Sequence, residues 1–283
     1  MFSGCGESTE ANAFYYKPTW TRDGKIICVK GLQSLKKDFL GSQTGSSYHE
    51  SVIMMSAAGT GETYLFDVSS APPSRMTCSP TGDYLAYLDD LRGDWFYRIV
   101  VRNIASGVHL GLDKVEIVFT KGIVSFDWSS DGTKLVYCTT EEICTIGVNG
   151  AGDTLVAADA ALEFVSWKNG GRIAFIRTVG TNKILSLIKP DGSGRLDQVA
   201  AASVDLPQIS AINTNEVFGI AGGAYCRVDV SALSPATVEV IAGFRGDLPR
   251  LSQAADNIVY SKTGETSGIY ISNINTKQEN KLR

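Results

Sequence analysis

Histidine is scarce in this sequence, with only His49 and His109 among 283 residues. Histidine is the usual acid–base group near neutral pH and the commonest metal ligand, so few such sites are available here. The metalloprotease, nucleophile-elbow, phosphate-loop and dinucleotide-binding signatures are also absent. The sequence therefore marks no catalytic residue, no metal ligand and no cofactor site, and we expect a binding protein without a cofactor rather than an enzyme.

Long apolar runs and charge of one sign are missing as well. No stretch approaches the 18 apolar residues that a membrane-spanning helix needs. The 26 basic and 30 acidic residues leave a net charge of −4, which excludes a strongly basic nucleic-acid surface. A hydrophobic content of 43% is too high for a disordered chain. We expect a folded protein that does not bind nucleic acid.

Six cysteines occur, but none forms a CxxC pair or stands beside a histidine. This spacing disfavours zinc. Cys138 and Cys144 flank a predicted hairpin, whose turn at 141–142 would place Thr139 opposite Cys144, so we expect no disulfide there. Cys28 and Cys226, like Cys138, fall in apolar strands, where a buried thiol is the ordinary outcome.

Glycine is abundant, at 29 residues, and recurs in a repeated pattern. Six segments begin with an aromatic or small residue, continue through a polar turn that often contains Asp-Gly, and end in an apolar strand. Their mean spacing of about 46 residues is close to the ~40–45 residues of a four-stranded propeller blade. The segments begin at Trp20, Cys78, Trp128, Trp167, Ala211 and Ser252.

Each repeat has a second half in which β-forming residues precede another glycine-rich turn, as in Ile184 to Gly194. The pattern predicts an all-β, six-bladed β-propeller with four antiparallel strands in each blade. We expect one domain over 13–283, preceded by a flexible tether at 1–12. The outer strand of the closing blade is expected near Lys277–Arg283, with residues 8–15 as the alternative.

The best-preserved repeats resemble the TolB-type propeller with WD40-like bacterial repeats. The resemblance lies in Trp128-Ser129-Ser130-Asp131-Gly132, followed by Leu135 and Tyr137, and in Pro190–Gly194 followed by Leu196. It covers the chain from Tyr16 onward and implies the fold, whereas the small α/β domain of TolB has no counterpart here. We expect the tryptophans to fill space between blades and the turn aspartates to accept backbone hydrogen bonds.

The first repeat contains an insertion, Gly31 to Glu50, which holds the one candidate helix, Leu35–Leu40. Two interpretations remain open. The insertion is either a tolerated surface loop or a docking loop over one mouth of the channel. Its candidate binding residues are Lys36, Lys37, Tyr48 and His49.

Two further connections supply candidate binding residues at the same mouth. The blade-two loop contributes Asp89, Arg92, Asp94 and Trp95, and the connection between blades five and six contributes Arg245, Asp247 and Arg250. Trp95 beside arginine has the composition of an interface anchor, although it could equally begin an apolar strand. The acidic cluster could hold Ca²⁺ but suits a solvated loop better, and the two Arg-Gly-Asp triplets suit turns.

Polar residues alternate along the strands predicted to be innermost, which indicates a hydrated central channel. These groups could satisfy one another across the ring, or they could bind a polar ligand or peptide. The channel-lining candidates are Lys17, Arg75, Asp127 and Gln208.

Phe2-Ser3-Gly4-Cys5 resembles the end of a bacterial lipoprotein signal, where small residues precede an acylated cysteine, although a chance occurrence is also open. Lipid attachment at Cys5 would place the chain in the periplasm or at the outer membrane, and the alternative is cytoplasmic. The resulting hypothesis is a monomeric, non-catalytic scaffold of the bacterial envelope that binds a protein partner or polar ligand. Its membrane contact would be limited to the lipid. The alternative is a hydrolase or lyase that uses loop residues at the channel mouth.

Overall fold

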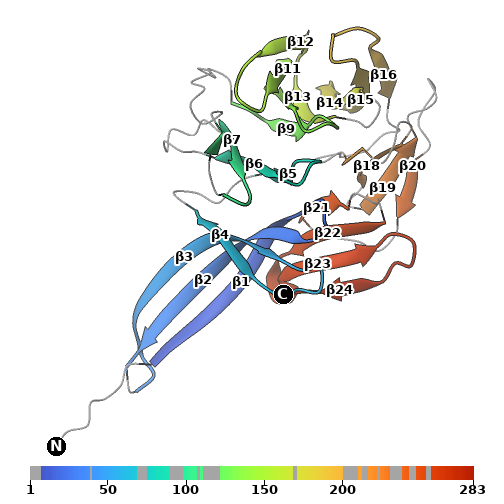
Figure 1. Ribbon diagram of the computed structural model, residues 1–283. Helices are drawn as coiled ribbons and strands as arrows, with labels where there is room; N and C mark the ends of the chain where they lie inside the picture. Colours follow the sequence, from blue (N-terminus) through green and yellow to red (C-terminus); the bar gives the residue numbers. More distant parts are fainter. Residues whose placement is uncertain are drawn as a thin grey trace, which may run out of the picture.

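The protein is described by a computed structural model, in which the sheets are arranged in a ring (Figure 1). The described residues are 8–38, 40–68, 75–89, 98–106, 109–110, 122–167, 171–199, 210–211, 216–221, 224–229, 238–241, 247–252 and 256–283.

The strands pair in chain order into antiparallel sheets of four. The first two sheets are β1 (Ser8–Trp20), β2 (Ile26–Lys37), β3 (Gln43–Met55) and β4 (Thr63–Asp67), then β5 (Met76–Cys78), β6 (Tyr84–Asp89), β7 (Arg98–Asn103) and β8 (His109–Leu110). The next two are β9 (Ser125–Trp128), β10 (Lys134–Cys138), β11 (Glu142–Gly147) and β12 (Thr154–Ala158), then β13 (Leu162–Trp167), β14 (Ile173–Val179), β15 (Asn182–Ile188) and β16 (Leu196–Val199). The last two are β17 (Ser210–Ala211), β18 (Glu216–Ala221), β19 (Ala224–Asp229) and β20 (Val238–Ile241), then β21 (Asp247–Leu251), β22 (Asn257–Lys262), β23 (Gly268–Asn273) and β24 (Glu279–Lys281).

The prediction of six regular blades with four strands each needs correction, because the sheets are unequal. The structure supports five blades, each with three or four strands whose side chains are described, rather than the six predicted. The sheet β17–β20 is defined by backbone pairing alone and starts from a strand of two residues. The second sheet likewise ends in the two-residue β8. The repeat period indicated a propeller but overestimated its number of complete blades, because it carries no information on how far each strand pairs.

Apolar layers between neighbouring sheets form the core. Ile27 and Val52 of the first sheet pack with Leu85 and Val100 of the second, and Ile26 and Cys28 pack on the opposite face against β22 and β23. The second and third sheets, and the third and fourth, enclose similar clusters. The first three sheets are therefore apolar on both faces, as radial stacking of blades requires.

The repeated Trp and Asp-Gly residues have the structural roles expected from the sequence. Trp128 Nε1 donates to the Thr77 carbonyl of the preceding sheet at 3.1 Å, and Trp20 Nε1 donates to the Arg250 carbonyl at 3.0 Å. Asp131 accepts from Ser129 Oγ at 2.7 Å and from the Thr133 amide at 2.9 Å. The tryptophans thus join neighbouring blades, and the aspartate shapes the turn.

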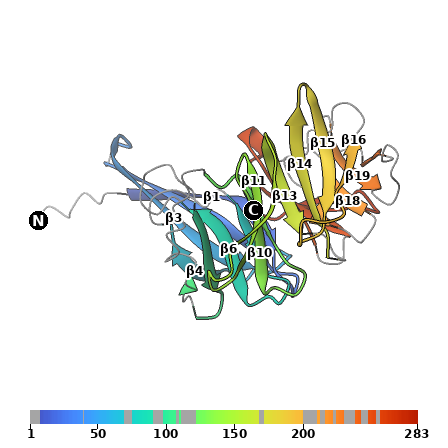
Figure 2. The ribbon, with the colours of Figure 1, turned by 90° about the horizontal axis from the view of Figure 1, so that it is seen from above.

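The predicted insertion at 31–50 is not a loop, and its candidate helix is wrong. Leu35 to Lys37 lie in β2, which pairs with β3 from Ile26–Met55 out to Lys37–Gln43. With β1 this hairpin forms a three-stranded arm that projects from the ring in both views (Figures 1 and 2). We call residues 8–16 and 30–50 the arm. Alternating Ser, Gly and Gln obscured the strand pattern in the sequence.

The C-terminal residues supply the outer strand β24, as the first of the two alternatives predicted, because β24 pairs with β23. The amide of Ile269 donates to the Arg283 carbonyl at 3.0 Å, which fixes the chain end. Residues 8–12, expected to belong to a tether, instead begin β1. In the part of the chain that the structure describes, no helix is long and apolar enough to cross a membrane.

The hairpin at Cys138 and Cys144 differs in register from the prediction. Cys144 lies opposite Tyr137 rather than Thr139, and Cys138 lies opposite Ile143. Both thiols are free, in agreement with the expectation of no disulfide.

Candidate functional site

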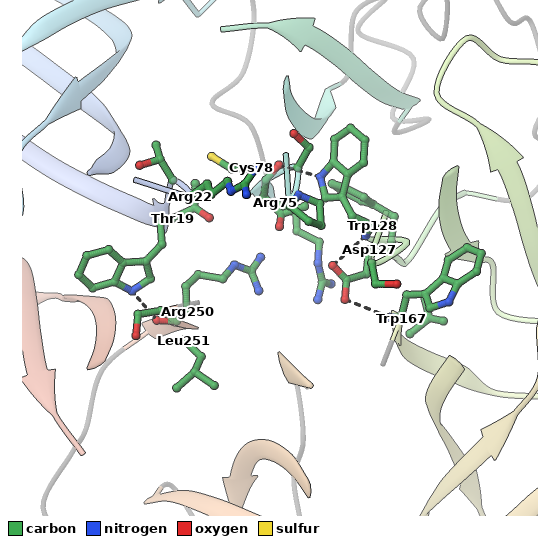
Figure 3. Close-up of a pocket in the computed structure, with 18 of the residues that line it drawn as sticks. Thr19, Arg22, Arg75, Cys78, Asp127, Trp128, Trp167, Arg250 and Leu251 are labelled. Carbon is green, nitrogen blue, oxygen red and sulfur yellow. Dashed lines mark hydrogen bonds between the residues drawn. The ribbon is translucent and has the colours of Figure 1, made fainter. Parts of the chain in front are cut away.

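A cavity of about 270 Å³ lies at the channel end where the inner strands run into the turns leading to the second strands. We call this end the turn mouth. Its walls come from the turns after β1, β5, β9 and β21 and from the side chains of Arg75, Asp127 and Arg250 (Figure 3). The predicted site lay at the opposite mouth, where second-to-third-strand connections meet, whereas the described residues form this cavity at the turn mouth.

Asp127 on β9 links its own strand to β13. Its carboxylate accepts hydrogen bonds from the amide of Trp128 at 2.9 Å, from the amide of Trp167 at 3.1 Å, and from Ser166 Oγ. Ser125, two residues earlier, exchanges bonds of 3.0 and 3.2 Å with the backbone of Val165. The inner strands β9 and β13, which do not pair as a sheet, are therefore joined by side chains.

Two guanidinium groups face the channel near Asp127. Arg75 lies at the start of β5, and its guanidinium carbon stands 4.2 Å from the centre of the Phe164 ring. Arg250 on β21 reaches into the same space from the other side of the channel (Figure 3). Stacking on Phe164 leaves the edges of the Arg75 guanidinium available for polar groups, because cation–π contact uses only its flat face.

Burial shifts the pKa values of these groups. Desolvation and then the like charge of Arg250 lower the pKa of Arg75 to about 9, while Asp127 opposes the shift. Desolvation also lowers the pKa of Arg250, again opposed by Asp127. Desolvation raises the pKa of Asp127 despite its three hydrogen bonds. Arginine stays protonated in proteins, so among the described side chains of this cavity two cations lie near one carboxylate.

The chemistry that this arrangement supports is recognition of an anion. Two guanidinium groups can form paired hydrogen bonds with a carboxylate or phosphate oxygen. Cys78 also lines the cavity, but burial raises the pKa of its thiol to about 12, which keeps it protonated and weakly nucleophilic. Within the described ranges, no group of three or more His, Cys, Asp or Glu side chains could hold a metal ion.

Of the candidate residues, the structure brings Arg75, Asp127 and Arg250 together. Lys17 lies apart from this cavity, at a bulge in β1, with its ammonium 5.7 Å from the Tyr16 ring centre and a positive φ of 51°. Burial lowers the pKa of Lys17, and Glu50 opposes that shift.

Among the remaining candidates whose side chains are described, none joins this cluster. Lys36, Lys37, Tyr48 and His49 lie on the arm, where His49 Nε2 is 3.0 Å from a carboxylate oxygen of Asp67. Asp89 ends β6 and Asp247 begins β21, and only their backbones are described. Cys5, Arg92, Asp94, Trp95, Gln208 and Arg245 lie outside the described residues.

Sequence reasoning missed the contribution of the repeat turns to the cavity. Thr21, Arg22, Pro80 and Ser130 line it together with Trp128. Their signal was visible, because Arg22, Pro80 and Ser130 each stand two residues after the end of an inner strand, at the same place in their repeats. The sequence analysis interpreted those positions only as turn residues. Arg22 adds a third positively charged side chain to the lining of the cavity.

Comparisons with known proteins support the fold. No family model matches the chain, and no curated protein matches it in sequence. A crystal structure of TolB from Acinetobacter baumannii superposes with a TM-score of 0.63 over 88% of this chain and 75% of that one, at 9% identity. A chain in a crystal structure of a nidogen/laminin complex superposes with a TM-score of 0.59 over 95% and 92%, also at 9% identity.

The chain has a TolB-like β-propeller fold. The resemblance noted in the repeats is therefore confirmed at the level of fold. At 9% identity the superpositions carry no information on ligand or partner.

Proposed function

We propose that this chain is a non-catalytic protein-binding propeller whose turn mouth receives an anionic group of its partner. The observation that carries the proposal is the placement of two half-buried arginines, Arg75 and Arg250, around one carboxylate in a cavity open to solvent. Among the described side chains that line the cavity, basic groups outnumber acidic ones, in contrast to the net charge of −4 of the whole chain. A carboxylate side chain or a chain terminus of a partner protein would complete the charge balance.

The fold neighbours are consistent with this class of function. One of them is a chain in a nidogen/laminin complex, and the other is TolB. By extension from the TolB-like fold and from the Ser-Gly-Cys sequence at Cys5, we propose an exported protein of the bacterial envelope, held to the membrane by a lipid on Cys5. The other predicted mouth residues, including Trp95, stay part of this proposal as secondary contacts.

The alternative of a hydrolase or lyase has one observation in its favour, because the raised pKa of Asp127 is of the kind found in acid–base sites. That carboxylate, however, accepts three hydrogen bonds, and two of them join β9 to β13. Three of its roughly four lone-pair sites are therefore already used by the protein itself. A turnover screen of the isolated chain against ester, peptide, glycoside and polyuronate substrates separates the two: turnover that Asp127→Asn abolishes favours the enzyme.

The binding proposal is tested by affinity capture from bacterial envelope extract, followed by calorimetry with the purified captured protein. Arg75→Gln and Arg250→Gln remove the two charges, and Lys25→Gln removes an exposed charge that pairs only with the nearby Asp23 in the described salt bridges. Each channel variant should weaken binding at least tenfold, with a smaller salt dependence, while Lys25→Gln binds as wild type. Equal binding by all four proteins would exclude the channel as the site.

A further inference from the structure

The arm has a free edge of β-strand. Strand β1 pairs with β2 on one side from Ser8 to Trp20. Among the described strands, none pairs with its other side, so β1 ends its sheet. From Ser8 to Phe14 the arm lies beyond the ring, and these seven residues span about 23 Å at ~3.3 Å per residue. An edge of this length exposes backbone amides and carbonyls that can template another strand.

The residues on this edge lack the usual protection against pairing. Proteins block exposed edges with lysine, proline or bulges. Between Ser8 and Tyr16 there is no Lys, Arg or Pro, while the arm's lysines Lys30, Lys36 and Lys37 all lie on the central strand β2. The bulge at Lys17 and the following Pro18 come only where β1 enters the ring. The protected part of β1 is thus the part that packs in the propeller.

The side chains of the arm suit a continued sheet. Phe14 lies over Gly31, where an added Cβ would fall 2.2 Å from the ring, and it stacks on Tyr48 with ring centres 5.7 Å apart. Ala11 and Ala13 are exposed on the other face and leave it flat. The opposite edge, Gln43 to His49, is richer in Gly and Ser, which pack poorly in strands.

We propose that two copies of this chain associate through antiparallel pairing of their β1 edges, which joins two arms into one six-stranded sheet. Antiparallel pairing of identical strands is two-fold symmetric and closes on itself. Centred on Ala11, the pairing sets Ala11 against Ala11, Glu10 against Asn12, and Ser8 against Phe14, so no charge faces its like. Because the arm projects from the ring in both views, the two rings stand clear of each other (Figures 1 and 2).

This proposal replaces the monomer expected from the sequence, since the arm was not visible there. It does not depend on the channel. Its test is the mass of the full chain by sedimentation equilibrium over about 1–200 µM. The mass should rise from 30.3 kDa toward twice that value. Ala13→Lys on the β1 edge should raise the dimer dissociation constant at least tenfold. Gln33→Lys on the central strand and Ser47→Lys on the opposite edge should leave it within twofold.

Cross-linking tests the register in a Cys5→Ser background. Ala11→Cys should form a disulfide-linked dimer under mild oxidation, because directly opposed residues have Cβ atoms about 4.5–5.5 Å apart. Ser47→Cys should remain monomeric on a denaturing gel. The proposal is overturned if wild type stays at 30.3 kDa throughout, if the three lysine variants behave alike, or if Ser47→Cys links and Ala11→Cys does not. A strand captured from another protein by a chain that stays monomeric overturns it as well.

Discussion

Replacing Asp127 with alanine should destabilise the ring where β9 meets β13. Two of its three hydrogen bonds, from Ser166 Oγ and from the Trp167 amide, cross between these strands. Net contributions of hydrogen bonds to a charged acceptor are about 1.5–3 kcal/mol each. In the variant, water from the channel replaces part of the lost hydrogen bonding. Loss of the negative charge beside Arg75 and Arg250 destabilises the folded state further. We expect Asp127→Ala to lower the free energy of unfolding by about 3 kcal/mol.

The assay is urea unfolding followed by tryptophan fluorescence, with the denaturant slope compared between variants. Asp127→Asn keeps one acceptor oxygen and should lose about half as much. Asp23→Ala is the matched control, because Asp23 is an exposed turn aspartate bonded only to Thr21 and Lys25 in the described structure, and it should lose under ~1 kcal/mol. If Asp127→Ala loses no more than Asp23→Ala, side-chain linkage of β9 to β13 does not stabilise the ring.

Two further predictions concern pH and the arm. Burial raises the pKa of Asp127, so the folded chain holds this proton more tightly than the unfolded chain; the stability advantage of wild type over Asp127→Asn should therefore shrink as pH rises from about 4 toward neutrality. Burial raises the pKa of Asp197, but hydrogen bonds from Ser186 and Arg195 outweigh burial and lower it overall. The stability advantage of wild type over Asp197→Asn should therefore be present at neutral pH and shrink as pH falls below about 4. Urea titrations at several pH values measure both trends, and the same trend for both variants would contradict the prediction. Gly31→Ala should displace Phe14 and lower the thermal midpoint, whereas Gly45→Ala, whose Cβ meets nothing nearer than 4.0 Å, should not; equal melting curves would contradict the stacking of Phe14 over Gly31.

Much of the fold was predictable because its determinants are local. The turn at Asp131 and Gly132 is held by bonds within five residues, and Gly132 takes a positive φ of 70°. Such turns recur at each repeat and reveal the period. The arm was not predictable, because a strand that lies outside the core needs no alternation of apolar and polar residues. The unequal pairing of β8 and β17 depends on contacts between strands, which the repeat does not encode.

The site was predictable residue by residue but not as a group. Alternation on the inner strands identified Arg75 and Asp127, whereas Arg250 was selected only as part of a connection between blades. Their meeting depends on the ring, since β5, β9 and β21 belong to three different sheets. Sequence separation gives no measure of distance across a closed ring. Arg250 was expected at the mouth where connections between blades meet, whereas in the structure it lines the cavity at the turn mouth.

The charge distribution defines which partners could use the turn mouth under the proposed function. The net charge of −4 repels an acidic protein at long range, but that repulsion is screened beyond about 8 Å at physiological ionic strength. Inside the channel Arg75 and Arg250 act in a cavity with protein walls, where screening is weaker and the field is focused. A partner with a uniformly acidic surface would gain nothing from this arrangement. A partner that presents one carboxylate on a narrow projecting segment would reach both arginines while the rest of its surface stayed outside the mouth.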